Sequence, residues 1–414
     1  MNPAPALDTA ADVMPDTSTA PLRPRGSNNG GLRQFNERVV LHAIRVHGSL
    51  PKADIARLTG LTAQTIGLIT TRLEEDGLLL KQERVRGRIG QPSVPMALNP
   101  DGAYSIGIKV GRRRTEWLLV DFTGQERARH TLSYDFPDIA TLRPAIAQHL
   151  AQFTAQLGPL ASRLVGVGVA APFQLGGWHR MLGLSPEQAD VWNHIDLRAE
   201  IQALTPLPVS FSRDTLAACV AELVNGRGHD LKNFLYLFVD TFVGGGLVIN
   251  SQLHAGAHGN AGAVASLPMQ ASGPGRVPPQ VISQASLWEL EQHFLREQLD
   301  PSAAYDERAL QAPFAASTER WLDEAAWALA HCIVSGTAML DLQDVVLDGT
   351  LDPALLQQLR ERTEAVLPQC NWEGLWAPRL HSGRIGPHAC ALGGALLPLH
   401  ANFAMDSDVF LKTT

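Results

Sequence analysis

Residues 52–76 read KADIARLTGLTAQTIGLITTRLEED, and this stretch decides the fold of the N-terminal part of the chain. Apolar residues recur at helical spacing on both sides of Gly60, which can adopt the left-handed conformation that a tight turn between helices needs. The pattern predicts a helix over 52–59 and a second helix over 62–76, with Thr62 capping the second. That second helix is predicted to bury Ile66, Ile69 and Leu73 along one face. The stretch therefore predicts a helix-turn-helix.

The flanking sequence extends this motif to a winged helix-turn-helix. An apolar periodicity over 36–47 predicts one helix before the motif. Residues 78–83 and 93–98 are predicted as two strands around a polar, glycine-rich tip at 84–92. Three helices followed by a hairpin are typical of DNA-binding winged helices, and we assign them to a domain over 32–98. The alternative is a small helical domain that contacts other proteins.

The charge distribution favours DNA as the partner of this domain. Residues 32–90 hold ten Lys and Arg against six Asp and Glu, which gives this segment a net charge of about +4. Since the whole chain has a net charge of −7, the rest of the chain carries about −11. In such folds, the helix after the turn presents glutamine and threonine to base edges, while basic side chains hold phosphates. The predicted DNA-contacting residues are Lys52, Thr62, Gln64, Thr65, Arg72, Arg86 and Arg88. The partner would be a double-stranded operator; the alternative is a chance fluctuation of charge.

Composition limits the remaining classes of protein. A chain of 414 residues with 45% hydrophobic content is too long for one core, so two or three domains are expected. Residues 1–31 carry few large apolar groups, and a disordered tail is expected there. No apolar run is long enough for a membrane span, and the N-terminus lacks a secretion-signal pattern. The four cysteines form no close pair, which fits a reducing cytoplasm.

The sequence after Pro100 predicts a two-lobed α/β body, because a pattern of strands, crossover helix and further strand occurs twice. Residues 233–239 and 246–249 are predicted as a hairpin around a turn at Gly244–Gly246. The other predicted strands cover 104–109, 115–121, 127–134, 164–170, 207–211 and 344–347. The predicted helices cover 142–157, 215–225, 286–299, 308–312, 318–338 and 353–367.

The order of several motifs resembles the ROK family of repressors and sugar kinases, in particular its repressor branch. The motifs are IGIKVGRRRTEWLLVDFTG (106–124), VGVGVAAP (165–172), Ser185-Pro186 with Trp192, SRDTLAACVAELVNG (212–226) and VDTFVGGGLVINSQLHAGAHGNAGAV (239–264). The resemblance implies an actin-like, hexokinase-like (ribonuclease H-like) body with a cleft between two lobes. We expect the first lobe over 99–212 plus 395–414, and the second over 213–394.

The family's phosphate-binding motifs are altered in this chain. Its first phosphate loop, D-x-G-G-T, corresponds to a run in which Lys109 replaces the Asp and Arg112 replaces the second Gly. Its second loop, G-T-G-x-G, corresponds to a run with Asp240 and Phe242 in place of two glycines. Negative charge and bulk where bare backbone should meet phosphate both oppose ATP. The body is therefore expected to be non-catalytic, without a nucleotide cofactor.

The sugar and zinc motifs of the family are also altered. In the family's sugar motif, G-E-x-G-H, Ala263 replaces the Glu and Ser266 replaces the His. The family's zinc motif needs cysteines, but residues 269–279 contain none, so no metal site is expected. Asp214 corresponds to the family's catalytic base; its alternative role is to cap a helix. Arg213 beside it is expected to keep the Asp214 carboxylate ionised and could bind an anion. The expected ligand-binding residues are Asp214, Arg213, Ser185, Glu187, His258, Asn260 and Ser266, the last five with loop polarity as the alternative.

Together these features predict a ligand-responsive transcription regulator of carbohydrate-related genes, acting as a repressor. The expected effector is a sugar or sugar derivative, and the expected assembly is a homodimer or dimer of dimers because two winged helices read two half-sites. One alternative is a regulator whose body only dimerises and binds no ligand. The other is an active ATP-dependent sugar kinase with a DNA-binding appendage.

Overall fold

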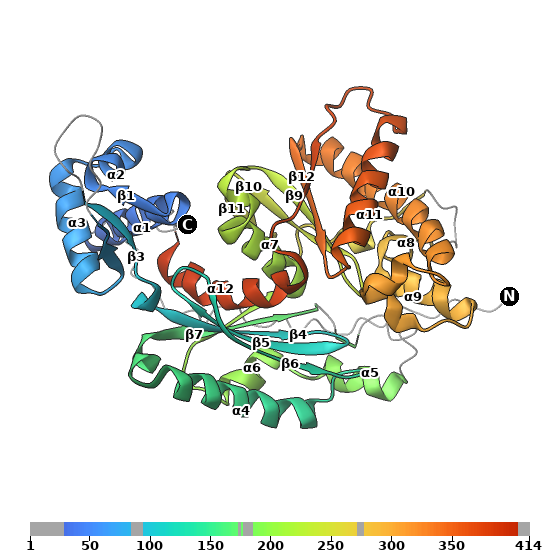
Figure 1. Ribbon diagram of the computed structural model, residues 1–414, viewed down its shortest axis with the longest axis horizontal. Helices are drawn as coiled ribbons and strands as arrows, with labels where there is room; N and C mark the ends of the chain where they lie inside the picture. The colour runs from blue at the N-terminus through green and yellow to red at the C-terminus, as the bar shows by residue number, and fades with distance from the viewer. Residues whose placement is uncertain (1–28, 84–93, 173–174, 177–184, 271–276, 405–414) are drawn as a thin grey trace.

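The computed structural model describes residues 29–83, 94–172, 175–176, 185–270 and 277–404. A small N-terminal unit lies at one end of a larger body, and the body consists of two lobes, each built on one five-stranded sheet (Figure 1). Within the described part of the chain, no helix is long and apolar enough to cross a lipid bilayer.

The N-terminal unit contains three helices and a three-stranded sheet. Its elements are α1 (Asn29–His47), β1 (Ser49–Pro51), α2 (Lys52–Thr59), α3 (Ala63–Glu75), β2 (Leu79–Lys81) and β3 (Pro95–Leu98). The strands are antiparallel in the order β1-β3-β2. Gly60 takes the predicted left-handed conformation at φ 71°, and the Thr62 hydroxyl accepts from the Thr65 backbone N–H at the start of α3. The predicted core residues Ile66, Ile69 and Leu73 are buried.

Two expectations for this unit need correction. Helix α1 begins at Asn29, so residues 29–31 are helical and do not belong to a disordered tail; the rest of that tail, 1–28, lies outside the described residues. Strand β1 was not expected, because it is only three residues long and contains Pro51. The tip at 84–92 also lies outside the described residues.

The first lobe has a sheet in the order β6-β5-β4-β7-β8, with helices on both faces. Its strands are β4 (Tyr104–Val110), β5 (Arg114–Asp121), β6 (Glu126–Ser133), β7 (Leu164–Ala171) and β8 (Val209–Arg213). Helices α4 (Ile139–Leu157), α5 (Pro186–Asn193) and α6 (Leu197–Gln202) lie on the outer side, and α12 (Ala389–Phe403) covers the inner face (Figure 1). Short 3-10 turns at Pro100–Gly102 and Gly158–Arg163 precede β4 and β7.

The second lobe repeats this plan with a sheet in the order β11-β10-β9-β12-β13. Its strands are β9 (Phe234–Val239), β10 (Gly244–Ile249), β11 (Gln252–His254), β12 (Asp344–Gly349) and β13 (Arg379–Ser382). Helix α7 (Asp214–Asn225) packs on one face; α8 (Ile282–Ala285), α9 (Leu287–Arg296), α10 (Ala315–Leu340) and α11 (Pro353–Val366) lie on the other side. Both sheets have two antiparallel and two parallel pairings in the same order, so the predicted two-lobed α/β body is confirmed.

The glycines Gly244–Gly246 do not form the turn that was expected. They lie inside β10, and the turn before it is made by residues 240–243. A Cβ at Gly244 would lie 2.5 Å from Thr215 Cγ2, and one at Gly246 would lie 2.6 Å from Cys219 Cβ. The bare backbone of β10 therefore lets α7 lie close to the sheet.

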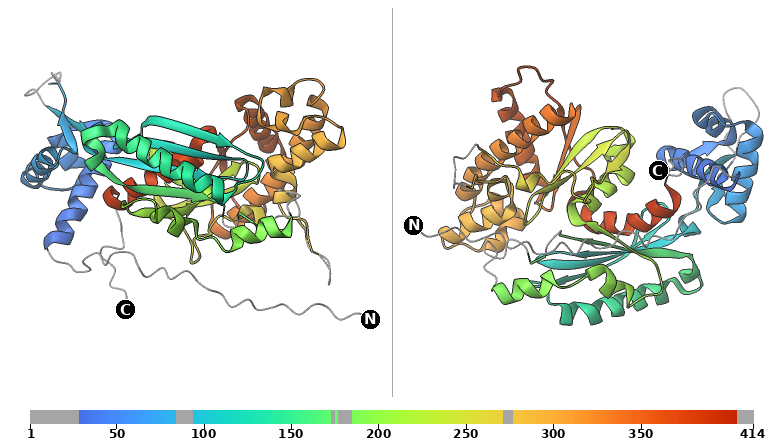
Figure 2. Two further views of the ribbon diagram at one scale, coloured as in Figure 1. Left: turned by 90° about the horizontal axis from the view of Figure 1, so that it is seen from below. Right: turned by 180° about the vertical axis from the view of Figure 1, so that it is seen from behind.

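Helices α7 and α12 form the contact between the lobes, with α12 between the first sheet and α7 (Figure 2). A Cβ at Gly393 would lie 1.7 Å from the Ala217 carbonyl oxygen, so the two helices approach closely at that point. The expected boundary between residues 394 and 395 falls inside α12 and divides one continuous helix.

Candidate functional site

A buried ion pair joins the lobes where the two altered phosphate loops meet. Lys109 lies near the end of β4, and Asp240 directly follows β9; Lys109 Nζ lies 3.0 Å from Asp240 Oδ2. The Lys109 side chain is 3% exposed and that of Asp240 is 20% exposed. Asp240 Oδ1 also accepts hydrogen bonds from the Thr241 backbone N–H (2.8 Å) and from Thr350 Oγ1 (2.9 Å).

The charges of this pair stabilise each other against their burial. Burial disfavours the charged form of Asp240, but Lys109 and then Arg114 outweigh it, so the pKa of Asp240 is lowered to about 2. Burial also disfavours the charge on Lys109, but Asp240 outweighs it and the pKa of Lys109 is raised. Both groups are therefore charged at neutral pH.

Two further contacts connect the same loop of the first lobe to the second lobe. The Arg112 guanidinium carbon lies 4.6 Å from the centroid of the Phe242 ring, a cation–π contact. Arg113 Nη2 lies 3.3 Å from Glu291 Oε2, on α9. We call these three contacts, Lys109–Asp240, Arg112–Phe242 and Arg113–Glu291, the interlobe clasp. Arg113 is 43% exposed, so its ion pair contributes less than the buried pair.

A second buried carboxylate lies beneath the clasp and was not singled out from the sequence. Glu116 is paired in register with Lys109 on the neighbouring strand and is almost fully buried. Its carboxylate lies 2.9 Å from Arg114 Nε and 3.1 Å from His388 Nδ1. Burial opposes its charge, but the hydrogen bond from His388 and the charge of Lys109 outweigh it and lower the pKa of Glu116 to about 2. The sequence did contain a signal for this residue, because Glu116 is a single acidic residue in the interior of a mostly apolar predicted strand.

Asp214 begins α7 near Arg112, Lys109 and Asp240, but its environment differs from the expected one. Its Oδ1 accepts from the Thr215 backbone N–H at 2.8 Å, so it does serve the helix N-terminus. Burial raises the pKa of Asp214 above its ordinary value, and Arg112 is the cation that opposes this shift most strongly. Arg213 Nη2 donates to the His258 carbonyl oxygen at 3.3 Å, and burial lowers the pKa of Arg213 while the charge of Asp214 opposes this shift. The expected role of Arg213 in keeping the Asp214 carboxylate ionised stays a prediction.

The remaining expected ligand-binding residues lie in loops. The structure brings the His258 backbone to Arg213, next to Asp214. Ser185 and Glu187 interact with each other at the start of α5, and this hydrogen bond lowers the pKa of Glu187. The exposed residues of this set are Glu187, His258, Asn260 and Ser266. In the described ranges, no group of three or more His, Cys, Asp or Glu side chains is arranged to hold a metal ion.

The exposed face of α3 in the N-terminal unit forms a shallow hollow. It is lined by Lys52, Gln64, Gly67, Leu68, Thr71, Arg72 and Glu75. Gln64 is exposed in the first turn, and Leu68 one turn further on is 66% exposed. The Thr62 and Thr65 hydroxyls lie 2.9 Å apart and bond to each other.

Arg72 and the two wing arginines stand apart from this group. Arg72 Nη1 pairs with Glu37 Oε1 of α1 at 2.8 Å, so a phosphate would have to compete with that carboxylate. Arg86 and Arg88 lie outside the described residues.

The duplicated sheets and the helix pair between them define an actin-like, hexokinase-like two-lobed fold, with the site at the carboxyl ends of β4 and β9. A model of the ROK family matches residues 105–400, and the chain belongs to that family.

Both regulators and kinases are found among the proteins that resemble this chain. It is 24% identical over 246 residues to the xylose repressor of Bacillus subtilis (strain 168), covering 59% of this chain and 62% of the relative. It is 21% identical over 245 residues to the DNA-binding transcriptional dual regulator NagC of Escherichia coli K12, covering 58% and 59%. The chain thus matches about three fifths of the length of these relatives.

Solved structures share the fold at lower identity. A ROK family transcriptional regulator, a homologue of the E. coli MLC protein, superposes with a TM-score of 0.66 at 18% identity over 90% of this chain and 98% of its own. A ROK family glucokinase from Streptomyces griseus, in complex with glucose and AMPPNP, superposes with a TM-score of 0.57 at 18% identity over 71% and 99%. The fold is therefore common to both classes, and the function has to be argued from the site.

Proposed function

We propose that this chain is a sugar-responsive, DNA-binding transcription regulator, a repressor, whose kinase-like body senses a ligand without phosphorylating it. Matched relatives are named xylose repressor and NagC, which supports this class of function. The observation that carries the proposal is the buried Lys109–Asp240 ion pair, which occupies the cleft where a kinase of this family needs open phosphate loops.

The N-terminal unit is proposed to be a winged helix-turn-helix. The order α1, α2, Gly60 turn, α3 and the strand pair β2–β3 supports this assignment. In that arrangement, α3 would enter the major groove with Gln64 in its first turn, where a glutamine amide can bond adenine in a bidentate manner. Lys52, at the rim of the same hollow, would hold a phosphate. Two copies of the chain would read two half-sites of an operator.

The clasp argues against phosphoryl transfer. Nucleotide phosphates would have to compete with Asp240 for Lys109, and their binding would leave the largely buried Asp240 carboxylate without its main cation. Once exposed, the Asp240 carboxylate would repel the phosphates. Arg112 stacked on Phe242 fills the neighbouring position, which the family leaves to glycine. Without a phosphate site, no positioned electrostatic stabilisation of the transferred group is available.

A sensor role for the body is supported by Asp214. Its carboxyl is held at the start of α7 by the Thr215 N–H, and its raised pKa suits a group that exchanges hydrogen bonds with a neutral hydroxyl. Arg213 and the loop around His258 lie next to it and would complete the ligand contacts. The second candidate is a body that only dimerises; Ala263 and Ser266, in place of the family's Glu and His, favour it.

A selection from a pool of randomised DNA duplexes with the full chain tests the DNA-binding part. The selected duplex is then titrated by fluorescence anisotropy with and without D-xylose, N-acetylglucosamine, sugar acids and sugar phosphates. A sugar-dependent shift in Kd supports the sensor, whereas tight DNA binding that none of these ligands changes favours the body that only dimerises. Failure to enrich any duplex, or sugar-dependent ATP turnover above background, contradicts the proposal.

A further inference from the structure

Helices α7 and α12 both begin near the Lys109–Asp240 pair, at the expected cleft, and pack against each other. Asp214 is the first residue of α7, and Cys390, near the start of α12, is close enough to feel the charges of Lys109 and Asp214. Midway along, Gly393 lies against the Ala217 carbonyl. At 1.5 Å per residue, the two helices are about 18 Å and about 22 Å long. Their carboxyl ends therefore lie well away from the cleft, on the side of the N-terminal unit.

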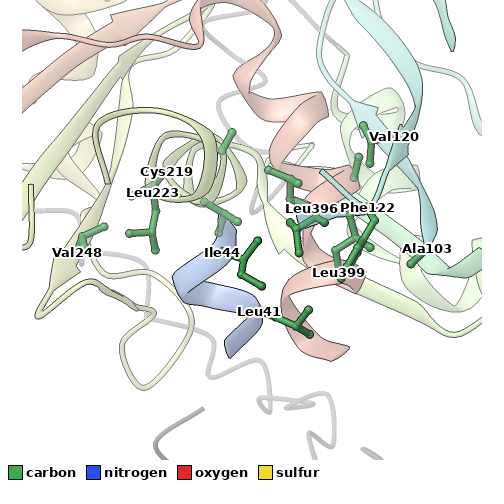
Figure 3. Packing of buried hydrophobic residues seen from close by; sticks show 14 of the residues in the cluster. Leu41, Ile44, Ala103, Val120, Phe122, Cys219, Leu223, Val248, Leu396 and Leu399 are labelled. Carbon is green, nitrogen blue, oxygen red and sulfur yellow. The ribbon is translucent and has the colours of Figure 1, made fainter. Parts of the chain in front are cut away.

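The first helix of the N-terminal unit is seated between those carboxyl ends. Figure 3 shows Leu41 and Ile44 of α1 between α7, which carries Leu223, and α12, which carries Leu399. Ile44 is fully buried. Arg38, one turn before Leu41 on α1, donates through Nη2 to the Ala401 carbonyl oxygen at the end of α12, at 3.5 Å. The N-terminal unit and the helix pair thus share one hydrophobic core.

The N-terminal unit is also attached directly to the first lobe. The Arg45 guanidinium lies 5.3 Å from the centroid of Phe122, just after β5, and burial lowers the pKa of Arg45 to about 10. Arg163, just before β7, donates through Nη1 to the Asp76 carbonyl oxygen at the end of α3, at 2.7 Å. Because α7 packs on the second sheet and shares a hydrophobic core with α1, the unit is linked to the second lobe through α7 as well as to the first lobe directly.

We propose that α7 and α12 transmit the state of the cleft to the N-terminal unit through the seat of Leu41 and Ile44, so that α3 is reoriented when the lobes move. This inference rests on the proposed function for its biological meaning, but the mechanical coupling can be tested without DNA. Close-packed helices move as rigid bodies, and a small shift at their cleft ends is carried to their far ends. A unit that contacts both lobes has to follow any change in the angle between them.

Hydrogen exchange measured by mass spectrometry on the full chain tests the coupling. The readout is exchange in the two cleft loops, residues 109–114 and 240–244, which lie far from the substitution. Ile44→Ala weakens the packing of α1 between α7 and α12. Ile44→Val removes less of the side chain and serves as the test variant if Ile44→Ala does not fold. The matched control is Ile55→Ala, which removes an equally buried isoleucine of α2 inside the N-terminal unit.

The expected result is at least a threefold faster exchange of the cleft loops in Ile44→Ala, a smaller effect in Ile44→Val, and no change in Ile55→Ala. Equal effects of the Ile44 and Ile55 variants, or no effect of either, would overturn the proposal. In a second arm, the selected duplex should slow exchange of the cleft loops in the wild type, since coupling between sites is reciprocal, and should slow it less in Ile44→Val with DNA bound. If no duplex is enriched, the regulator function fails, while the first arm still decides the coupling.

Discussion

A double-mutant cycle on the Lys109–Asp240 pair should give strongly non-additive losses of stability. The pKa of Asp240 lies at about 2 against an ordinary value of 3.8, so its whole environment, in which Lys109 is the largest favourable influence against burial, stabilises the folded carboxylate by roughly 2 kcal/mol at neutral pH. Lys109→Met should cost at least about that much, although Asp240 keeps its hydrogen bonds from Thr241 and Thr350. Asp240→Asn should cost more, about 3–5 kcal/mol, because Lys109 is then a buried cation without its partner.

The variant that carries both substitutions should lose less than the sum of the two single variants, because no buried charge remains unpaired. We expect about 1–3 kcal/mol for the double variant and a coupling energy of about 3 kcal/mol. Urea unfolding followed by tryptophan fluorescence at pH 7 measures all four chains. A matched control cycle uses the half-exposed pair Arg113 and Glu291, whose coupling should stay near or below about 1 kcal/mol. Additive losses at Lys109 and Asp240, within about 0.5 kcal/mol, would refute the reasoning.

Three further outcomes follow from the same structure. Gln64→Ala should relax sequence preference at one base position by about 1–3 kcal/mol in competition binding with single-base variants of the selected duplex; an unchanged preference would mean that α3 does not read bases. Lys52→Ala should weaken all duplexes alike and reduce the slope of log Kd against log salt by about 1, and an unchanged slope would remove Lys52 from the phosphate contacts. The pKa of Asp240 is lower in the folded than in the unfolded chain, so the ionised carboxylate stabilises the fold above about pH 4, and this stabilisation is lost as pH falls towards 2. The free energy of unfolding of Asp240→Asn should therefore depend less steeply on pH than that of the wild type between about pH 4 and 2. The same slope in both chains would contradict the assigned pKa.

The N-terminal helices could be predicted closely because their signals are local. The turn at Gly60, the cap at Thr62 and the buried face of α3 all lie within the stretch that forms them. The ion pair between Arg72 and Glu37 could not be foreseen, because it joins residues 35 positions apart on two helices. Arg72 thus has a protein partner in this structure, and its predicted contact with a phosphate stays a prediction.

Helix α12 was missed for a physical reason. It contains Gly393, Gly394 and Pro398, which disfavour a helix in isolation, and it is buried on most sides, so its sequence has no polar face to give a periodicity. The glycines are needed for close approach, since a Cβ at Gly393 would meet the backbone of α7. Tertiary packing therefore outweighs local propensity at the centre of the molecule.

The loss of open phosphate loops could be predicted from residue types, but the clasp could not. The negative charge of Asp240 and the bulk of Arg112 and Phe242 already opposed ATP. Only the fold brings Lys109 to Asp240, 131 positions away, and turns two altered loops into one contact between lobes. Likewise, Arg112 is the cation that most strongly lowers the pKa of Asp214 against the effect of burial, although Arg213 is the neighbour of Asp214 in the sequence.

Titration calorimetry of the full chain with magnesium-ATP addresses the proposed nucleotide-free body. The same protein sample is first shown to bind its selected duplex, so that its folding is established independently. With Lys109 and Asp240 paired across the cleft, no saturable heat is expected up to about 1 mM nucleotide. Stoichiometric binding with a micromolar Kd would show that the phosphate loops still work and would contradict a body that senses without phosphorylating.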